Sequence, residues 1–307
     1  MAATRRYFFS VITPTFNRAH TLERAYLSLC DQSFQDFEWL IIDDGSTDNT
    51  AELVAAWQQQ ASFPIRYQWQ PNQHKKAAFN RGVRMAEGRF VVVLDSDDAL
   101  DTNALFAMHR VWLDIPAADH GRFASVTGLC ARPDGRVVGD MFPRDVFDTT
   151  AIDIALRYHV RGEKFGCTRT DLLQRFTYPE DIAGFVPESL VWRAIARAGY
   201  KSRCVNQVFR VYHDNPQSLS GQSFDPVSQA AGLCLLARDT LVECLPWFRF
   251  SPLEFFKAGV RYNRFRLALW HAGKALPQAC RLKGLRSRLL VALTWPLGAA
   301  LHWRDRS

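Results

Sequence analysis

The stretch FVVVLDSDD, residues 90–98, decides the fold because it joins a buried strand to a group of carboxylates. Its five leading apolar residues indicate a strand that is covered on both faces. Similar runs occur at Val11–Pro14 and Trp39–Ile42, with a weaker one at Ile65–Trp69. Strands that alternate with helices predict an α/β fold with a mixed, mostly parallel sheet flanked by helices. The helical segments lie at about residues 19–32, 47–60 and 76–86.

Polar clusters follow three of the predicted strands directly, at residues 13–18, 43–48 and 95–98. Ligands of α/β sheets bind outside the carboxyl ends of the strands, so these clusters predict a binding site at that edge. The chain after Asp98 is less regular. There we expect a helix at 102–113, a hairpin over Ala124–Met141 turning at Pro133-Asp134-Gly135, helices near 149–159 and 189–198, a strand at 202–212, and helices beyond about residue 222.

The polar clusters contain side chains with two interpretations each. Asp95 and Asp97 can hold Mg²⁺ or Mn²⁺, which prefer oxygen ligands, or they can lie in a solvated turn before a helix. A carboxylate in residues 43–48 can accept a hydrogen bond from the imide N–H of uracil, or the segment can be an ordinary capped turn around Gly45. Phe16 can stack on a nucleobase or fill the core.

The combination of motifs resembles the family 2 glycosyltransferases, which have the GT-A fold. The resemblance rests on Thr-Pro-Thr-Phe-Asn-Arg at residues 13–18, on Asp-Asp-Gly-Ser-Thr-Asp at 43–48, and on Asn-Arg-Gly at 80–82 ahead of residues 92–98. These motifs occur in order and at suitable spacing over Phe9–Asp101, and the similarity weakens towards Tyr212.

The resemblance implies inverting transfer of a sugar from a nucleotide diphosphate donor to a hydroxyl acceptor. It also assigns roles to residues around the donor base. Phe16 would stack on that base, and Thr13 and Pro14 would contact it through their backbone. Asp44 would hold the base N–H, which favours UDP-sugars and dTDP-sugars over GDP-sugars.

The resemblance also implies a cofactor, Mn²⁺ or Mg²⁺. Asp95 would lie beside the ribose and the metal, and Asp97 would be the principal metal ligand. His213 would meet the metal or the diphosphate, with a structural role as the alternative. Lys75 or Lys76 occupies the place where relatives carry a basic residue near the base or the diphosphate, although residues 73–76 depart from the family pattern.

A general base must take the proton from the acceptor hydroxyl in such a reaction. Relatives usually supply it from a Glu-Asp pair before a helix, some ninety residues after the metal motif. Glu188 has the matching place, with Ser189 where Asp is frequent, and we prefer it. Asp181 is the alternative, because Glu180-Asp181 spells the pair but lies early.

Composition and charge bear on the setting of the protein. The seven cysteines form no Cys-x-x-Cys pair, and the first residues do not form a signal peptide, so we expect a reducing, cytoplasmic location. Residues 247–307 hold twelve Lys or Arg against two acids, a net charge of +10 within a chain total of +7. Basic helices with interleaved aromatic residues favour an anionic membrane surface, so a peripheral position at the inner face of the plasma membrane is one expectation. Solvated helical faces are the alternative.

The expected organisation is a catalytic domain at 1–222, with a nucleotide-sugar half at 1–101 and an acceptor half at 102–222, followed by a basic helical region at 223–307. The resemblance implies a saccharide or lipid-linked acceptor in cell-surface polysaccharide or glycolipid synthesis, and no nucleic acid partner is expected. One rival class is a nucleotidyltransferase, which should open with a glycine-rich phosphate loop, whereas residues 13–18 contain no glycine. The other is a catalytically weakened nucleotide-sugar-binding protein.

Overall fold

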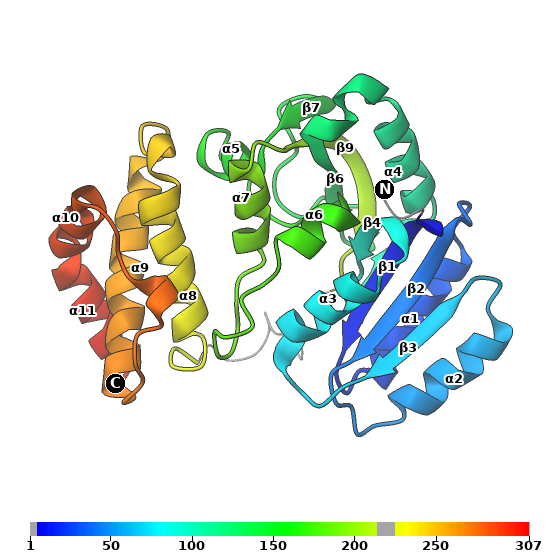
Figure 1. Ribbon diagram of the computed structural model, residues 1–307, viewed down its shortest axis with the longest axis horizontal. Coiled ribbons are helices and arrows are strands. Elements are labelled where there is room, and N and C mark those ends of the chain that lie inside the picture. Colours follow the sequence, from blue (N-terminus) through cyan, green and yellow to red (C-terminus); the bar gives the residue numbers. More distant parts are fainter. Residues whose placement is uncertain (1–4, 214–224, 307) are drawn as a thin grey trace. The chain divides into compact units, whose positions relative to one another are not determined.

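The computed structural model describes residues 5–213 and 225–306, and the chain forms two compact units (Figure 1). The first unit takes in Met1–Ala151, Val160–Thr177 and Ala194–Gln222, and the second takes in Ile152–His159, Tyr178–Arg193 and Ser223–Ser307. The strands are β1 (Tyr7–Thr15), β2 (Phe37–Asp43), β3 (Ile65–Trp69), β4 (Gly88–Val93), β5 (Ala99–Leu100), β6 (Phe123–Ala131), β7 (Val146–Thr149), β8 (Lys164–Arg169) and β9 (Lys201–Val211). The α-helices before β9 are α1 (Ala19–Cys30), α2 (Thr50–Gln60), α3 (His74–Met85), α4 (Ala104–Leu113), α5 (Ala151–Leu156), α6 (Thr170–Arg175) and α7 (Ser189–Arg197).

The N-terminal half of the first unit is a parallel sheet in the order β3-β2-β1-β4. Thr15 at the end of β1 pairs with Asp43 at the end of β2, which in turn pairs with Trp69 at the end of β3. The carboxyl ends of these strands therefore lie at one edge, and the loops that follow them meet there. The predicted strands and helices of this half are confirmed to within a few residues at each end.

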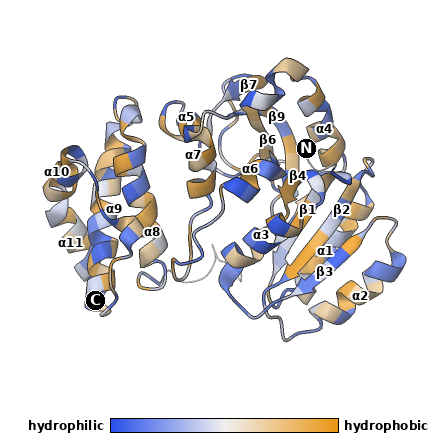
Figure 2. Ribbon diagram, in the orientation of Figure 1, coloured by the Kyte–Doolittle hydropathy of each residue, from blue (hydrophilic) through white to orange (hydrophobic). Residues whose placement is uncertain are grey.

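Both faces of the parallel strands are covered. Phe9, Trp39 and Phe90 belong to a core shared with α1, α2 and α4. On the opposite face α3 packs closely, since a Cβ added at Gly82 would lie 2.5 Å from a methyl group of Ile12. Figure 2 shows the hydrophobic residues that run along β1 and β2, as expected for strands buried on two sides.

The sheet continues from β4 through β8, β6 and β9 to β5, with β7 also paired to β9. The predicted hairpin over Ala124–Met141 is confirmed at its turn but not along its length. Its first part is β6, but after the turn at Gly135 only an isolated bridge joins Val137 to Ala131. The partners of β6 are β8 on one side and β9 on the other. These two strands satisfy its backbone N–H and C=O groups, so a longer hairpin partner is not needed. The pairing of Leu100 with Arg210 also brings the segment after the acidic motif against β9.

The second unit is helical in its C-terminal part, as predicted. Its helices are α8 (Ala230–Arg238), α9 (Pro252–His271), α10 (Leu285–Leu293) and α11 (Trp295–Arg304), with a π-helical turn at Asp239–Glu243. The buried Asn263 of α9 donates to the Val291 carbonyl at 2.7 Å, and Arg264 pairs with Asp305 at 2.5 Å. None of the described helices is long and apolar enough to span a membrane.

Candidate functional site

The loop after β2 is a tight turn that Asp43 holds together. Oδ1 of this buried carboxylate accepts a 2.7 Å hydrogen bond from the Ser46 N–H, and Oδ2 accepts one of 2.5 Å from the Tyr67 hydroxyl. Gly45 has φ +94°, and a Cβ there would lie 3.0 Å from the backbone nitrogen of Asn72. The turn therefore requires glycine, and the Asp43 side chain serves the fold.

Asp44 is buried in the same turn, but among the described residues its side chain accepts hydrogen bonds through one oxygen only. Its N–H donates to the Thr15 carbonyl at 2.8 Å, which ties the turn to the end of β1. Its Oδ1 accepts hydrogen bonds from Gln70 Nε2 at 2.7 Å and from the Gln73 N–H at 2.9 Å. Its Oδ2 has no hydrogen-bond partner among the residues that the structure describes. A buried carboxylate with one oxygen fixed and one uncommitted is suited to accept a ligand N–H.

The loop after β1 is fastened to the loop after β2. Asn17, at φ 51°, donates its N–H to Ser46 Oγ at 2.8 Å, and its Oδ1 accepts the Thr47 N–H at 2.8 Å. The Ala19 N–H donates to Asp48 Oδ2 at 3.1 Å. Phe16 lies within this fixed loop and is 46% exposed, so it does not fill the core. Its ring is available to a planar ligand.

The end of β1 contributes two threonines with different roles. The Oγ1 of the fully buried Thr13 accepts a 2.9 Å hydrogen bond from Trp39 Nε1, so only its backbone remains for a ligand. Pro14 is buried beside it. Thr15 Oγ1 is buried and has no hydrogen-bond partner within the described part of the chain, and the sequence did not single it out.

Asp95 follows β4 and lies between two cations. The Nζ of Lys75 is 2.6 Å from Asp95 Oδ1, and Arg210 Nη1 is 3.5 Å from Oδ2. Burial acts to raise the pKa of Asp95, but the charges of Lys75 and Arg210 outweigh it and hold the pKa below its usual range. Asp95 is therefore ionised at neutral pH. Lys76, the neighbour of Lys75 in α3, is buried.

Arg210 is a central residue that the sequence analysis missed. Its buried guanidinium lies 3.3 Å from both Asp98 and Glu163, and 5.2 Å from the centre of the Phe165 ring. An arginine between Phe209 and Val211 in a buried strand was the available signal, because a buried charge requires partners.

Asp98 fastens the acidic loop to β9. Its Oδ1 accepts a 3.0 Å hydrogen bond from the His213 N–H, and its Oδ2 pairs with Arg210. Burial raises the pKa of Asp98 to about 7, against Arg210 and the His213 N–H, which lower it. The carboxylate of Asp98 is thus taken up by the fold, and it is Asp95 and Asp97 that remain partly exposed.

Asp97 and His213 share their surroundings with Arg24 of α1. The Asp97 carbonyl accepts a hydrogen bond from Arg24 Nη1. Burial and the Arg24 charge lower the pKa of His213, while Asp97 acts to raise it. Over residues 5–213 and 225–306, no group of three or more His, Cys, Asp or Glu side chains is arranged to hold a metal ion. The metal-ligand role of His213 stays a prediction.

The two predicted bases belong to the second unit. Glu188 directly precedes α7, where its carbonyl accepts the Val191 N–H at 3.0 Å, and its side chain is exposed. The side chain of Asp181 is exposed as well. The choice between Glu188 and Asp181 stays a prediction.

Known proteins share both the sequence motifs and the fold. A family profile described as glycosyl transferase family 2 matches residues 10–125, which contain Phe16, Asp44, Lys75, Asp95 and Asp97. Residues 10–125 thus form a glycosyl transferase family 2 domain. The GalNAc(5)-diNAcBac-PP-undecaprenol beta-1,3-glucosyltransferase of Campylobacter jejuni is 30% identical over 211 residues, which are 66% of this chain and 63% of that protein. The chain spans less than two thirds of the length of the curated relatives that it matches.

Two solved glycosyltransferases show the same architecture as this chain. The Staphylococcus aureus TarS 1–349 structure in complex with UDP-GlcNAc has a TM-score of 0.64 at 20% identity, over 97% of this chain and 91% of that one. The mannosyltransferase PcManGT of Pyrobaculum calidifontis, in complex with GDP-Man and Mn²⁺, has a TM-score of 0.57 at 20% identity, over 98% and 84%. These likenesses confirm the predicted GT-A type fold with its mixed sheet.

Proposed function

We propose that this chain is an inverting glycosyltransferase that uses a UDP-sugar or dTDP-sugar donor. The uncommitted Oδ2 of Asp44, at the carboxyl edge of the parallel strands, is the observation that carries the proposal. Since Oδ1 is already engaged, one acceptor remains. Uracil and thymine offer a single imide N–H to it, whereas guanine offers adjacent N–H donors that need two acceptors.

The exposed ring of Phe16 supports binding of the same base. The ring belongs to a loop that Asn17 and Ser46 hold in place, so the loop loses little conformational freedom when a ligand binds. Stacking of a base on such an aromatic contributes about 1–3 kcal/mol. The backbone of Thr13 and Pro14 and the free Thr15 hydroxyl line the same strand end.

The acidic loop supports handling of the donor diphosphate. Asp95 and Asp97 are hard oxygen ligands that suit Mg²⁺ or Mn²⁺, and with two carboxylates the donor phosphates would complete the coordination shell. When bound, such a cation stabilises the charge that develops on the leaving diphosphate. Lys75, already held at Asp95, would add positive charge beside that leaving group.

In the transfer step, the acceptor hydroxyl attacks the anomeric carbon from the side opposite the diphosphate, and the configuration inverts. Glu188 would remove the hydroxyl proton as the general base, with Asp181 as the alternative. No covalent intermediate with the enzyme is required in this scheme.

We propose a lipid-linked acceptor at a membrane surface. The Campylobacter jejuni relative is named for an undecaprenol-linked one. In α10, Leu285, Leu289 and Leu293 repeat every fourth residue and are 72%, 59% and 70% exposed. Trp270 and Trp303 are 70% and 57% exposed in the same unit. An exposed apolar helix face inside a segment of net charge +10 fits the surface of an anionic bilayer.

The direct experiment is a panel of UDP-sugars, dTDP-sugars and GDP-sugars with the purified chain and Mn²⁺, read by calorimetry and by donor hydrolysis. The proposal expects binding and slow hydrolysis of at least one uridine or thymidine donor. Binding of none of the panel would refute the donor site. Binding without hydrolysis or transfer would favour the nucleotide-sugar-binding alternative.

A further inference from the structure

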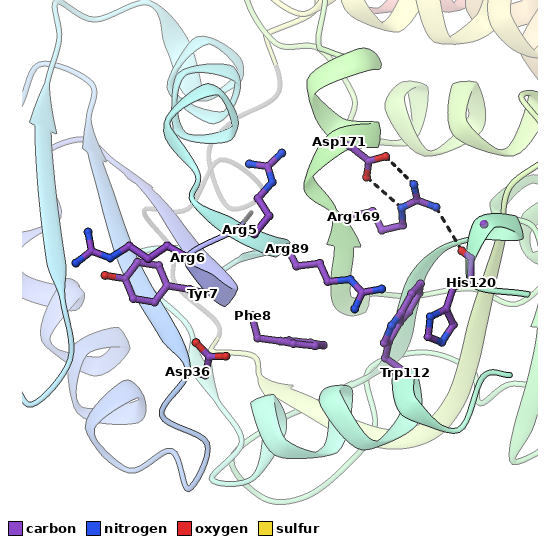
Figure 3. Close-up of a pocket in the computed structure, with 11 residues that line it drawn as sticks. Arg5, Arg6, Tyr7, Phe8, Asp36, Arg89, Trp112, His120, Arg169 and Asp171 are labelled. Carbon is purple, nitrogen blue, oxygen red and sulfur yellow. Dashed lines mark hydrogen bonds and ion pairs between the residues drawn. The ribbon is translucent and has the colours of Figure 1, made fainter. Parts of the chain in front are cut away.

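A cavity opens at the other end of the central strands in the first unit. It has a volume of ≈ 730 Å³, within the range of about 300–1,000 Å³ that is usual for small-molecule pockets. Tyr7 and Phe8 line it from the start of β1, and Arg89 lines it from the start of β4 (Figure 3). The length of β1 separates this end from Thr15, a distance of about 25 Å at 3.3 Å per residue. The cavity is therefore distinct from the proposed donor site.

The cavity is rich in positive charge. Arg5, Arg6, Arg89 and Arg169 line it, against the acids Asp36 and Asp171. Asp171 is neutralised by Arg169, which forms two hydrogen bonds to it at 3.0 and 2.6 Å. In Figure 3, Phe8 lies between Asp36 and Arg89. Arg6 pairs with Glu87 at 3.6 Å, so Arg5 and Arg89 are the lining arginines without an acidic partner among the described residues.

Among the described arginines that line the cavity, Arg89 is the one whose guanidinium is uncommitted. Its guanidinium makes no hydrogen bond or ion pair with any described residue, and lies 5.4 Å from the centre of the Trp112 ring and 5.5 Å from that of Phe90. Burial and the nearby Arg169 charge lower the pKa of Arg89, and Asp171 opposes them. Arg169 is held in place by Asp171 and by the His120 and Phe123 carbonyls at 3.3 Å. Two neighbouring guanidiniums, one fixed and one uncommitted, suit an oxyanion.

The walls of the cavity add an apolar, planar component. Phe8 and Trp112 flank Arg89, whose side chain extends towards Trp112 in Figure 3. The Trp112 side chain is buried, and its indole N–H has no acceptor among the residues that the structure describes. Phe8 is partly exposed, so a ligand that places an anion at Arg89 would rest its organic part on the Phe8 ring.

We propose that this cavity binds an organic phosphate, in which a phosphate group is attached to an aromatic ring. The phosphate engages Arg89 beside Arg169, and the ring lies against Phe8. The phosphate and the aromatic part both contribute, so neither an inorganic phosphate ion nor a neutral aromatic compound is a good substitute.

Phenyl phosphate is a suitable probe, with inorganic phosphate and phenol as its two halves. Calorimetric titration of the full chain is expected to show phenyl phosphate binding at least tenfold more tightly than either half. Arg89→Met should weaken that binding at least tenfold, since it removes a charge-assisted contact. Arg89→Lys should lose less, because it keeps the charge.

Two variants serve as controls. Arg136→Met removes an arginine whose side chain is 78% exposed elsewhere in the same unit, and Asp44→Asn alters the proposed donor site. Both should bind phenyl phosphate as the wild type does, whether or not the chain binds a nucleotide sugar. Wild-type affinity in Arg89→Met, loss of affinity in Asp44→Asn, or no binding by the wild type would each overturn the proposal.

Discussion

Arg210 and Asp98 form a buried ion pair in which Nη1 lies 3.3 Å from Oδ2 and the side chains are 6% and 3% exposed. Asp98 also accepts the His213 N–H, so the pair fastens the loop that carries Asp95 and Asp97 to the end of β9. A charge left without its partner at such a place is strongly unfavourable, because its lost hydration is no longer offset.

Arg210→Met should therefore lower the free energy of unfolding by about 3–5 kcal/mol, measured by urea denaturation. The substitution keeps much of the side-chain volume while leaving Asp98 buried without its cation. Adding Asp98→Asn to this variant should recover part of the loss, because the amide carries no charge. Arg136→Met, which breaks an exposed pair with Asp134, is the control and should leave the unfolding curve unchanged. An equally unchanged curve for Arg210→Met would show that the buried pair does not hold the loop.

Asp44→Asn should weaken binding of a uridine donor about tenfold to a hundredfold without loss of stability. The amide oxygen can still accept from Gln70 and Gln73, but an NH₂ group replaces the free Oδ2 and cannot accept the imide N–H. A hydrogen bond to a charged group contributes about 1.5–3 kcal/mol, which sets the expected range. Calorimetric affinity for UDP and the thermal midpoint are the two measurements.

Asp43→Asn is the matched comparison for Asp44→Asn, since the residues are adjacent and both are buried. Asp43 accepts from the Ser46 N–H and the Tyr67 hydroxyl, so this variant should lower the thermal midpoint. The proposed division of roles would be reversed if Asp44→Asn lost stability and Asp43→Asn kept it.

The sequence predicted the parallel half of the sheet well because its signals are local. Apolar runs such as residues 90–94 define strands, and the polar residues that follow them mark the edge where ligands bind. The motifs at Phe16, Asp44 and Asp95 each lie on a loop that directly follows its strand.

The second half of the sheet escaped prediction because its pairing is between distant segments. The turn predicted at Gly135 forms, yet along most of its length β6 pairs with β8 and β9. Arg210 was missed for the same reason, since the pairing of β9 with β5 brings it to Asp95 and Asp98. Which residues such a strand meets depends on tertiary packing, which no local pattern encodes.

Glu188→Gln should lower the turnover number by about a hundredfold to ten-thousandfold, the usual contribution of a general base, with donor affinity unchanged. Gln keeps the shape of the side chain but cannot take a proton at neutral pH. Single-turnover transfer to an acceptor, together with the Kd for UDP, separates the two effects. Asp181→Asn is the paired variant, and a loss of turnover there with normal transfer by Glu188→Gln would move the base to Asp181.

The stability of the second unit should fall as the pH drops below the pKa of an unperturbed histidine, about 6.5, because His302 is buried. His302 is 3% exposed in α11, and its Nε2 lies 3.0 Å from His271 Nδ1 of α9. Burial lowers the pKa of His302, and the charges of His271, Arg306 and Arg264 lower it further against Asp305.

The sign follows from proton uptake. Above a pH of about 6.5, His302 is neutral in both states, and below it the unfolded chain takes up a proton that the folded chain resists. Stability is therefore fully present above that pH and is lost as the pH falls towards the folded pKa. Urea denaturation at several pH values should show a smaller loss for His302→Gln than for the wild type. An identical pH dependence in the two proteins would exclude His302 as the cause.

Replacing Leu285, Leu289 and Leu293 together by Glu should release the chain from anionic vesicles. The three side chains are already exposed in α10, so the variant should fold normally. Full burial of one leucine contributes about 1.5–3 kcal/mol, and even partial insertion of three predicts at least a tenfold loss of binding. Sedimentation with vesicles of phosphatidylglycerol and phosphatidylcholine measures it. Leu27→Glu with Leu113→Glu, at 53% and 54% exposure in the first unit, is the control and should sediment as the wild type does. Because basic residues also contribute, high salt should weaken binding of the wild type to the vesicles. If the α10 variant sediments as the wild type does, this leucine face does not meet the bilayer.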